Sequence, residues 1–130
     1  MRILQPPAWA KPKGYANGIS CKGTLVFVAG QIGWTADGTW QTDDFAGQFA
    51  QALRNVVAVC AEAGAKPEHI VRLAWFITDK QAYLAGLKGV GAAYREIMGR
   101  HYPTMTVVEV GALVEDRAKI EIEATAMIPD

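Results

Sequence analysis

The strict alternation of residues 118–128 is the feature that most restricts how this chain can fold. A β-strand places successive side chains on opposite faces of a sheet, so a period of two predicts a strand with one buried face. A shift by one residue would bury the charged set, and we therefore expect the pairing register of this strand to be fixed. The apolar set is Ala118, Ile120, Ile122, Ala124, Ala126 and Ile128, and it alternates with Lys119, Glu121, Glu123, Thr125 and Met127.

Shorter patterns predict the other elements. Two runs, 16–21 and 24–29, flank Lys22-Gly23, a spacing typical of a β-hairpin. Residues 70–78 and 106–114 are rich in β-formers and predict two further strands. A helix should begin near Thr42 or Asp43, either of which can cap it, and end at Gly64. Its expected buried stripe is Phe45, Phe49, Leu53, Val56 and Cys60.

A second helix is expected over residues 80–99, weakened by three glycines and stopped by Pro103. Residues 1–13 form a Pro-rich lead-in that we expect to be irregular. No repeat or linker divides the chain, so residues 1–130 are interpreted as one domain. The economical arrangement is an α+β fold, a mixed sheet with two helices packed on one face. The buried stripe of the second helix is expected to be Leu84, Leu87, Val90, Tyr94, Ile97 and Met98.

Two helices can cover only one face of the sheet, yet the strands at 25–29 and 71–77 are apolar on both faces. A large exposed apolar patch is unusual on a monomer. The simplest cover is another copy of the same chain.

Charge and composition exclude several classes of function. The chain has 13 basic and 13 acidic residues and no basic cluster, which disfavours binding to nucleic acid through phosphates. No apolar stretch is long enough to span a bilayer, and the N-terminus lacks a signal-peptide core, so we expect a cytoplasmic protein without membrane contact. Cys21 and Cys60 lack metal-ligand spacing and are interpreted as reduced, buried or partly buried thiols. No metal site, nucleotide loop or catalytic Ser/His/Asp set is indicated.

Several short motifs fall together in the order and spacing of one family and cover nearly the whole chain. They are Gly14-Tyr15, Val28-Ala29-Gly30-Gln31, residues 48–55, Ala63-Gly64, Pro103 with Val107-Val108-Glu109-Val110, and Ile120-Glu121-Ile122-Glu123-Ala124. With them the sequence resembles the RidA/YjgF family. The resemblance implies a chorismate-mutase-like fold, a homotrimer, and small-molecule sites in clefts between subunits. It also implies hydrolysis of reactive enamines and imines to 2-keto acids and ammonia without a cofactor; older labels for the family are endoribonuclease and translation inhibitor.

The resemblance assigns roles to single residues. Glu121 matches the carboxylate that places or activates the attacking water, and Tyr15 matches a tyrosine near the cleft. Gly30 and Gln31 match the strand end whose backbone lines the cleft. Gly33 and Trp34 follow directly and are candidates for a backbone N–H donor and a cleft wall. The alternatives are a plain polar-face residue for Glu121, with Glu123 on the same face, and local packing for Tyr15 and Trp34.

One position departs from the pattern. Typical deaminating members have Pro-Ala-Arg, and the arginine grips the substrate carboxylate; this chain has Pro103-Thr104-Met105. A methionine offers apolar contact but no charge, so a carboxylate desolvated against Met105 would lack compensation. The standard 2-imino acid chemistry should then be weak, unless Arg100 or His101 supplies the cation. Met105 fits packing between subunits equally well.

Two hypotheses therefore stay open. The first is a cofactor-free hydrolase of an enamine or imine that lacks the usual carboxylate anchor. The second is a trimeric receptor for a small, mostly apolar metabolite. A ribonuclease is a third, disfavoured by the charge.

Overall fold

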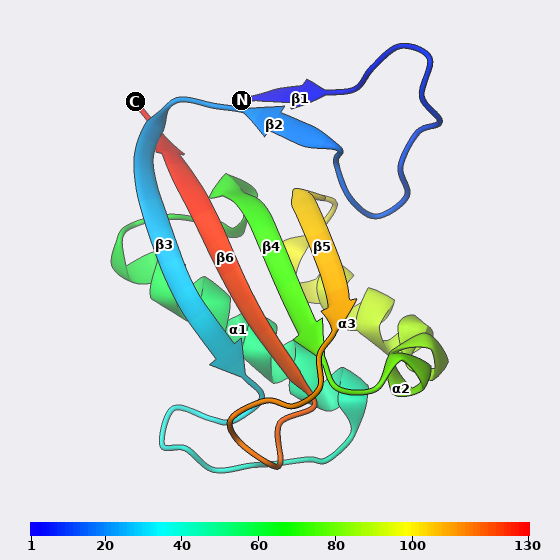
Figure 1. The fold of residues 1–130 in the computed structure, drawn as a ribbon. Helices are drawn as coiled ribbons and strands as arrows, with labels where there is room; N and C mark the ends of the chain where they lie inside the picture. Colours follow the sequence, from blue (N-terminus) through cyan, green and yellow to red (C-terminus); the bar gives the residue numbers. More distant parts are fainter.

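The computed structural model describes residues 1–130 as a sheet with helices on one side (Figure 1). A short 3₁₀ turn, η1 (Pro67–His69), leads into the fourth strand. The helices are α1 (Phe45–Glu62), α2 (Lys80–Ala85) and α3 (Leu87–Met98). The strands are β1 (Arg2–Leu4), β2 (Gly18–Ser20), β3 (Gly23–Ile32), β4 (Ile70–Ile77), β5 (Thr104–Glu109) and β6 (Ile120–Pro129).

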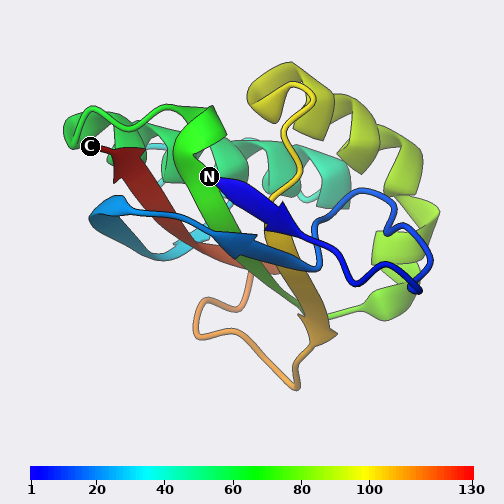
Figure 2. The same ribbon diagram turned by 90° about the horizontal axis from the view of Figure 1, so that it is seen from above.

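The main sheet has the order β3-β6-β4-β5. Strand β6 pairs antiparallel with both β3 and β4, whereas β4 and β5 are parallel. The helices α1 and α3 lie on the same side of this sheet (Figure 2). The predicted α+β architecture, a mixed sheet with helices on one face, is confirmed. No helix combines the length and the apolar character that crossing a membrane requires.

The C-terminal alternation produces the predicted strand. Ile120, Ile122, Ala124 and Ala126 are buried beneath the helices, while Glu123 is exposed on the other face. The register with β4 sets Ala124 opposite Leu73 and Glu121 opposite Phe76. The two-residue period was sufficient to predict this strand and its buried face, because one face of the strand is buried along its whole length.

Helix α1 follows its predicted stripe. Phe45, Phe49, Leu53, Val56 and Cys60 are all buried in one core of 19 residues. The cap lies slightly later than predicted: the Asp44 carboxylate accepts from Gly47 N at 2.9 Å. Gly64 adopts a φ of +80° just after the helix, a conformation that glycine adopts without strain. Both cysteines are free thiols, with Cys60 buried and Cys21 half-buried.

The predicted helix at 80–99 is two helices that meet at Gly86. This residue is the C-cap of α2, where its N–H donates to the carbonyls of Ala82 and Tyr83, and also the N-cap of α3. Val90, Tyr94 and Met98 are buried as predicted, but Leu84 and Leu87 are close to half exposed. Because the helix is broken at Gly86, these two leucines do not lie on one continuous buried face with Val90, Tyr94 and Met98.

The predicted hairpin of 16–21 with 24–29 is wrong. Strand β2 pairs with β1, inside the segment expected to be irregular, and the two form a separate ribbon above the main sheet (Figure 1). Gly23 belongs to β3 and lies so close to the end of β6 that a Cβ there would sit 1.9 Å from the carbonyl oxygen of Ile128. Strand β5 is also shorter than the expected 106–114, since it ends at Glu109.

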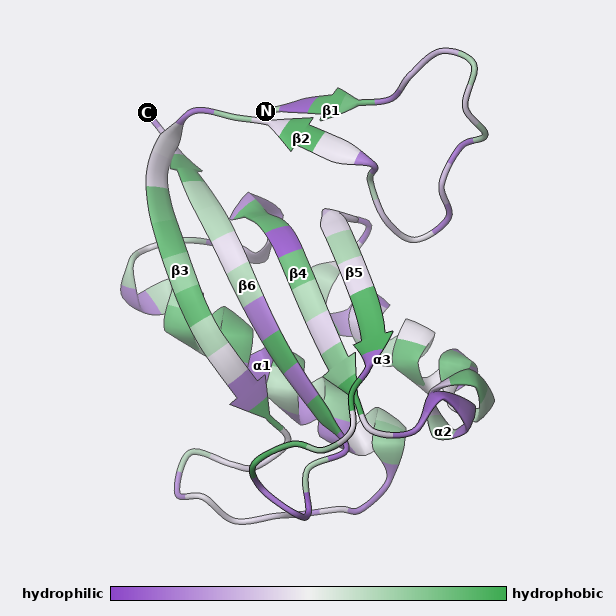
Figure 3. Cartoon of the chain, viewed as in Figure 1, coloured by the Kyte–Doolittle hydropathy of each residue, from purple (hydrophilic) through white to green (hydrophobic).

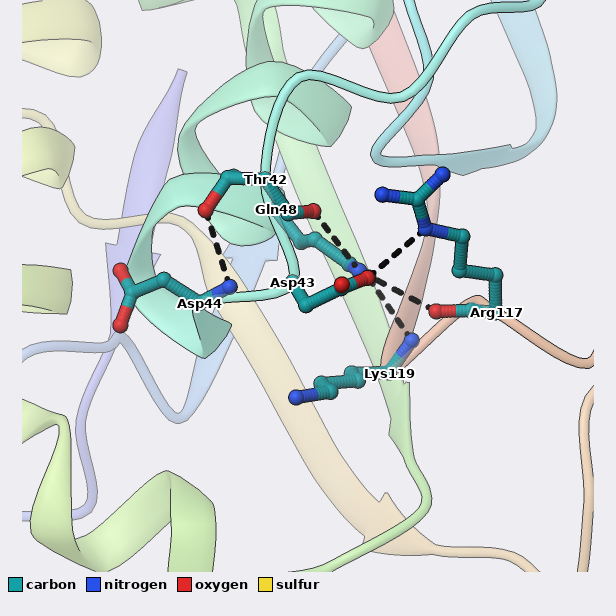
Figure 4. Close-up of polar contacts among 6 residues, drawn as sticks. All are labelled: Thr42, Asp43, Asp44, Gln48, Arg117 and Lys119. Atoms are coloured by element: carbon teal, nitrogen blue, oxygen red, sulfur yellow. Dashed lines mark hydrogen bonds and ion pairs between the residues drawn. The ribbon is translucent and has the colours of Figure 1, made fainter.

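A buried glutamine joins the start of α1 to the loop that precedes β6 (Figure 4). Gln48 has no exposed surface. Its Nε2 donates to the carbonyls of Thr42 (3.3 Å) and Arg117 (3.1 Å), and its Oε1 accepts from Lys119 N at 2.8 Å. Beside it, Arg117 Nε pairs with the Asp43 carboxylate at 2.8 Å. A fully buried amide with three partners fixes this corner of the fold.

The face of the sheet away from the helices is open. Phe27 is 74% exposed and Leu25 50% exposed on β3, a strand that is mostly apolar (Figure 3). These two lie opposite Thr125 and Met127 of β6. The chain itself supplies no layer over this face.

Candidate functional site

Glu121 lies at the start of β6 and borders a hollow of about 300 Å³. The register places it opposite Ile32 of β3 and Phe76 of β4, and its side chain is half-buried. No hydrogen bond or ion pair within the chain engages its carboxylate. A carboxylate in this state is free to accept a hydrogen bond from water or a ligand. Gly30, Gln31, Ile32, Trp34, Leu113, Val114 and Glu115 line the hollow with it.

Gly30 is in direct contact with this carboxylate. A Cβ at position 30 would lie 2.6 Å from Glu121 Oε1, so any side chain there would displace the carboxylate. The pairing of β3 with β6 is irregular between Val28 and Gln31, so the register shifts at Ala29-Gly30, as in a β-bulge. Two residues that the sequence proposed separately, Gly30 and Glu121, are thus brought together.

Trp34 and Gly33, the next two candidate residues, lie in different surroundings. Trp34 lines the hollow, and its carbonyl accepts from Asn55 Nδ2 at 2.8 Å while its ring lies 6.0 Å from that of Trp40. Gly33 is buried against α1 instead, where a Cβ would lie 2.7 Å from the Cβ of Gln48. Gly33 supports the wall of the hollow from behind.

Tyr15 and Met105 lie in a second hollow, of about 280 Å³, at the start of β5. Strand β5 is held there by Ala16, whose N–H donates to the Pro103 carbonyl at 3.0 Å. Arg72 of β4 lies opposite Thr104 and also lines this hollow. Met105 points to the helix side of the sheet, because it pairs with the core residue Leu73.

A single chain does not bring Glu121 and Met105 together. Glu121 lies opposite Phe76 and Met105 opposite Leu73, so they are offset by three residues along β4, roughly 10 Å at 3.3 Å per residue. They also lie on different strands, and Met105 and Glu121 are on opposite faces. A ligand of metabolite size cannot contact both within one subunit.

Neither residue suggested as a replacement for the absent arginine reaches Met105. His101 Nε2 is bound to the Ile70 carbonyl at 2.6 Å, and its own carbonyl accepts from the Tyr94 hydroxyl. Arg100 is exposed, and both residues border the N-terminal ribbon rather than the Met105 hollow.

Sequence reasoning missed the cations that do share a cavity with Met105. Lys13 and Arg95 lie with it around a cavity of about 420 Å³ between α3 and the start of β5. Burial raises the pKa of Tyr94 and of Tyr83, which line the same cavity, so both phenols stay neutral at neutral pH. Arg95 is exposed and follows the buried Tyr94 in α3, and no pattern in the sequence singles it out.

Comparison with known proteins agrees with this architecture. Residues 7–128 match the family model described as Endoribonuclease L-PSP. The 2-iminobutanoate/2-iminopropanoate deaminase of Salmonella typhimurium is 33% identical over 116 residues, 87% of this chain and 86% of that protein.

Solved structures show the same fold. A Yersinia pestis protein of the Rid family, YyfB, described as of unknown function, superposes with a TM-score of 0.85 at 28% identity and covers 98% of both chains. Escherichia coli TdcF, solved with bound serine, gives a TM-score of 0.70 at 30% identity and covers 98% of this chain and 99% of its own. The chain belongs to the RidA/YjgF family. Named relatives in this family are deaminases of reactive imines.

Proposed function

We propose that this protein is a cofactor-free hydrolase of a reactive enamine or imine, with Glu121 holding the attacking water. The observation that carries the proposal is the Glu121 carboxylate, unpaired and packed against the backbone of Gly30. Water adds to the carbon of the C=N bond, and one of its protons passes through the carboxylate to nitrogen. The remaining hydroxyl proton then follows by the same route as the C–N bond breaks, and a carbonyl compound and ammonia leave. The name of the Salmonella relative, an iminobutanoate and iminopropanoate deaminase, supports the same reaction class.

The complete site would lie between subunits of a homotrimer. Two observations support this assembly: Glu121 and Met105 are too far apart within one chain, and the face that carries Phe27 and Leu25 has no cover. In such a trimer the Glu121 hollow of one subunit faces the Tyr15 and Met105 hollow of its neighbour. Apolar burial would stabilise the assembly.

The substrate would be non-standard because of Met105. A small 2-imino acid needs a cation for its carboxylate, and the side chain at position 105 provides none. We therefore expect weak hydrolysis of imines such as 2-aminoacrylate by the natural protein. The variant Met105→Arg should raise kcat/KM on them by about tenfold to a few hundredfold, since a charge-assisted pair contributes roughly 1.5–3 kcal/mol.

A direct assay tests the proposal. Imines are generated in place by a pyridoxal-phosphate dehydratase, and their disappearance is followed in the presence of the natural protein, Met105→Arg, and Met105→Arg with Glu121→Gln. Removal of the carboxylate should lower the rate by about 10²–10⁴-fold. Glu123→Gln is the matched control, because Glu123 lies two residues further along β6 on the same face. Equal activity of the Glu121 and Glu123 variants would contradict the role given to Glu121.

The second candidate is a trimeric receptor without turnover. The observation in its favour is Met105, which removes the anchor for the usual substrate while the fold is kept. No gain in rate for Met105→Arg, with the trimer intact, would favour the receptor. A ribonuclease is disfavoured by zero net charge, and we expect no salt-dependent binding to single-stranded RNA.

A further inference from the structure

The cavity between α3 and the start of β5 has an apolar floor. Trp75 and Val90 are buried there, and Tyr83, Leu87 and Met105 complete the walls. Trp75 and Tyr83 meet edge to face at 6.4 Å. A volume of about 420 Å³ lies within the range of known small-molecule sites.

The charged groups at this cavity are all positive. Lys13 and Arg95 line it, and no aspartate or glutamate does. The chain has two ion pairs, Arg54 with Glu96 and Arg117 with Asp43, so neither cavity cation has a carboxylate within 4.0 Å. The remaining polar groups are phenols, and the Tyr94 hydroxyl already donates to the His101 carbonyl. The cavity thus offers two unpaired cations above an aromatic floor.

Glycine at position 91 keeps the cavity open. A Cβ at this position would meet only the guanidinium of Arg95, at 3.4 Å. Gly91 lies inside α3, where glycine lowers helix stability relative to other residues. Its local effect is the space that it leaves in front of Arg95.

We propose that this cavity binds an apolar carboxylate, with the carboxylate held by Arg95 and Lys13 and the apolar body packed on Trp75, Tyr83 and Met105. Arginine holds carboxylates in bidentate pairs, and aromatic rings with a methionine form an adaptable apolar surface. The inference goes beyond the proposed function, since binding in this cavity requires no hydrolysis and holds equally for a receptor. It also gives Met105 a purpose: the position contributes to the apolar wall, and the charges come from Arg95 of α3 and from Lys13 of the N-terminal segment.

Calorimetric titration of the purified protein with 3-phenylpropanoate tests the proposal. The alcohol 3-phenylpropan-1-ol has the same apolar body without the charge, and propanoate has the charge without the ring. We expect saturable binding of 3-phenylpropanoate, and at least about tenfold weaker binding of each of the other two. Equal binding of the alcohol, or no saturable binding of 3-phenylpropanoate, would overturn the proposal.

Two variants locate the site. Arg95→Gln should weaken the affinity for 3-phenylpropanoate by about tenfold or more while leaving the affinity for the alcohol nearly unchanged. Gly91→Leu should abolish binding of both, because its side chain fills the cavity, and it should not unfold a helix that prefers leucine to glycine. Arg100→Gln, an exposed cation outside the cavity, is the matched control and should bind like the natural protein.

Trp75 provides an independent readout. Its indole N–H is buried and has no hydrogen-bond partner, so its NMR resonance is sensitive to changes in the cavity. We expect this resonance, assigned with Trp75→Phe, to shift on addition of 3-phenylpropanoate to the natural protein and not to Gly91→Leu. Binding that leaves the Trp75 resonance unmoved would place the ligand elsewhere and refute the assignment.

Discussion

The two faces of the sheet are made from the same strands but differ in what lies over them. On the helix side, Leu73, Ile120 and Ile122 have no exposed surface. On the open side, Phe27 and Leu25 are largely exposed, and Glu121 and Glu123 lie among apolar neighbours. The helix side is a complete core, whereas the open side exposes apolar residues and is the face assigned to the proposed subunit interface. Stability should therefore depend on the first face and assembly on the second.

The largest effect is expected on the helix side. Phe49 has no exposed surface and lies 4.8 Å from Trp75 between ring centroids. Phe49→Ala should lower the free energy of unfolding by about 3–5 kcal/mol through lost burial and a cavity. Urea denaturation at fixed protein concentration measures this, with Val59→Ala on the exposed side of α1 as the control. A loss no greater than that of the control would contradict the assignment of the core.

On the open face, a charge should act on assembly rather than on the fold. Phe27→Asp should weaken subunit association by about 3 kcal/mol, more than a hundredfold, because the interface would bury an unpaired carboxylate. Sedimentation velocity should show loss of the trimer, while circular dichroism stays unchanged. Val59→Asp, on the helix side, should remain trimeric. A Phe27→Asp protein that sediments as the natural one would show that this face is not the interface.

An intermediate effect on stability is expected at Gln48, which joins the start of α1 to the loop that precedes β6. Gln48→Leu leaves the Thr42 and Arg117 carbonyls and the Lys119 N–H without their partner. We expect a loss of about 1–3 kcal/mol in the free energy of unfolding. Gln51→Leu, which removes one hydrogen bond to Asn55, is the control. Equal stability of the two variants in urea would mean that the Gln48 amide is not structurally required.

The smallest effect concerns the exposed ion pair of Arg117 with Asp43, beside Gln48. The hydrogen bond from Arg117 lowers the pKa of the Asp43 carboxyl below its ordinary value. A lowered folded-state pKa adds stability above the unfolded-state pKa, and this contribution is lost as the pH falls through the folded-state value. An NMR titration should find the Asp43 pKa depressed in the natural protein and restored towards its ordinary value in Arg117→Gln. An unchanged pKa in that variant would show that the ion pair has no effect in solution.

Prediction from the sequence worked where one periodicity ran unbroken. Strand β6 and helix α1 each bury one continuous stripe, so their faces could be assigned from spacing alone. Strands β1 and β2 have three residues each, too few for a period, and their pairing links the two ends of a long Pro-rich loop. The expected hairpin failed because local turn residues carry no information about so distant a partner.

The candidate site was only partly predictable for a related reason. Glu121 could be placed on the open face, but its contact with Gly30 depends on a bulge in β3 that no motif encodes. The break of the second helix at Gly86 and the orientation of Arg95 depend on how α3 packs. Arg95 lies outside the predicted buried stripe and is exposed, so its place at the rim of a cavity could not be inferred from helical spacing.

The position of β6 in the sheet also restricts when the protein can fold during synthesis. Strands β3 and β4 pair with β6 and not with each other, and β6 is synthesised after both of them. Until then, β3 has no hydrogen-bonding partner in the sheet, and β4 has only β5. The nascent chain therefore exposes apolar strand edges until β6 has been synthesised, and chaperones can bind these edges during that time. A stop codon before residue 120 would leave β3 without a partner in the sheet and only the β4–β5 pair formed.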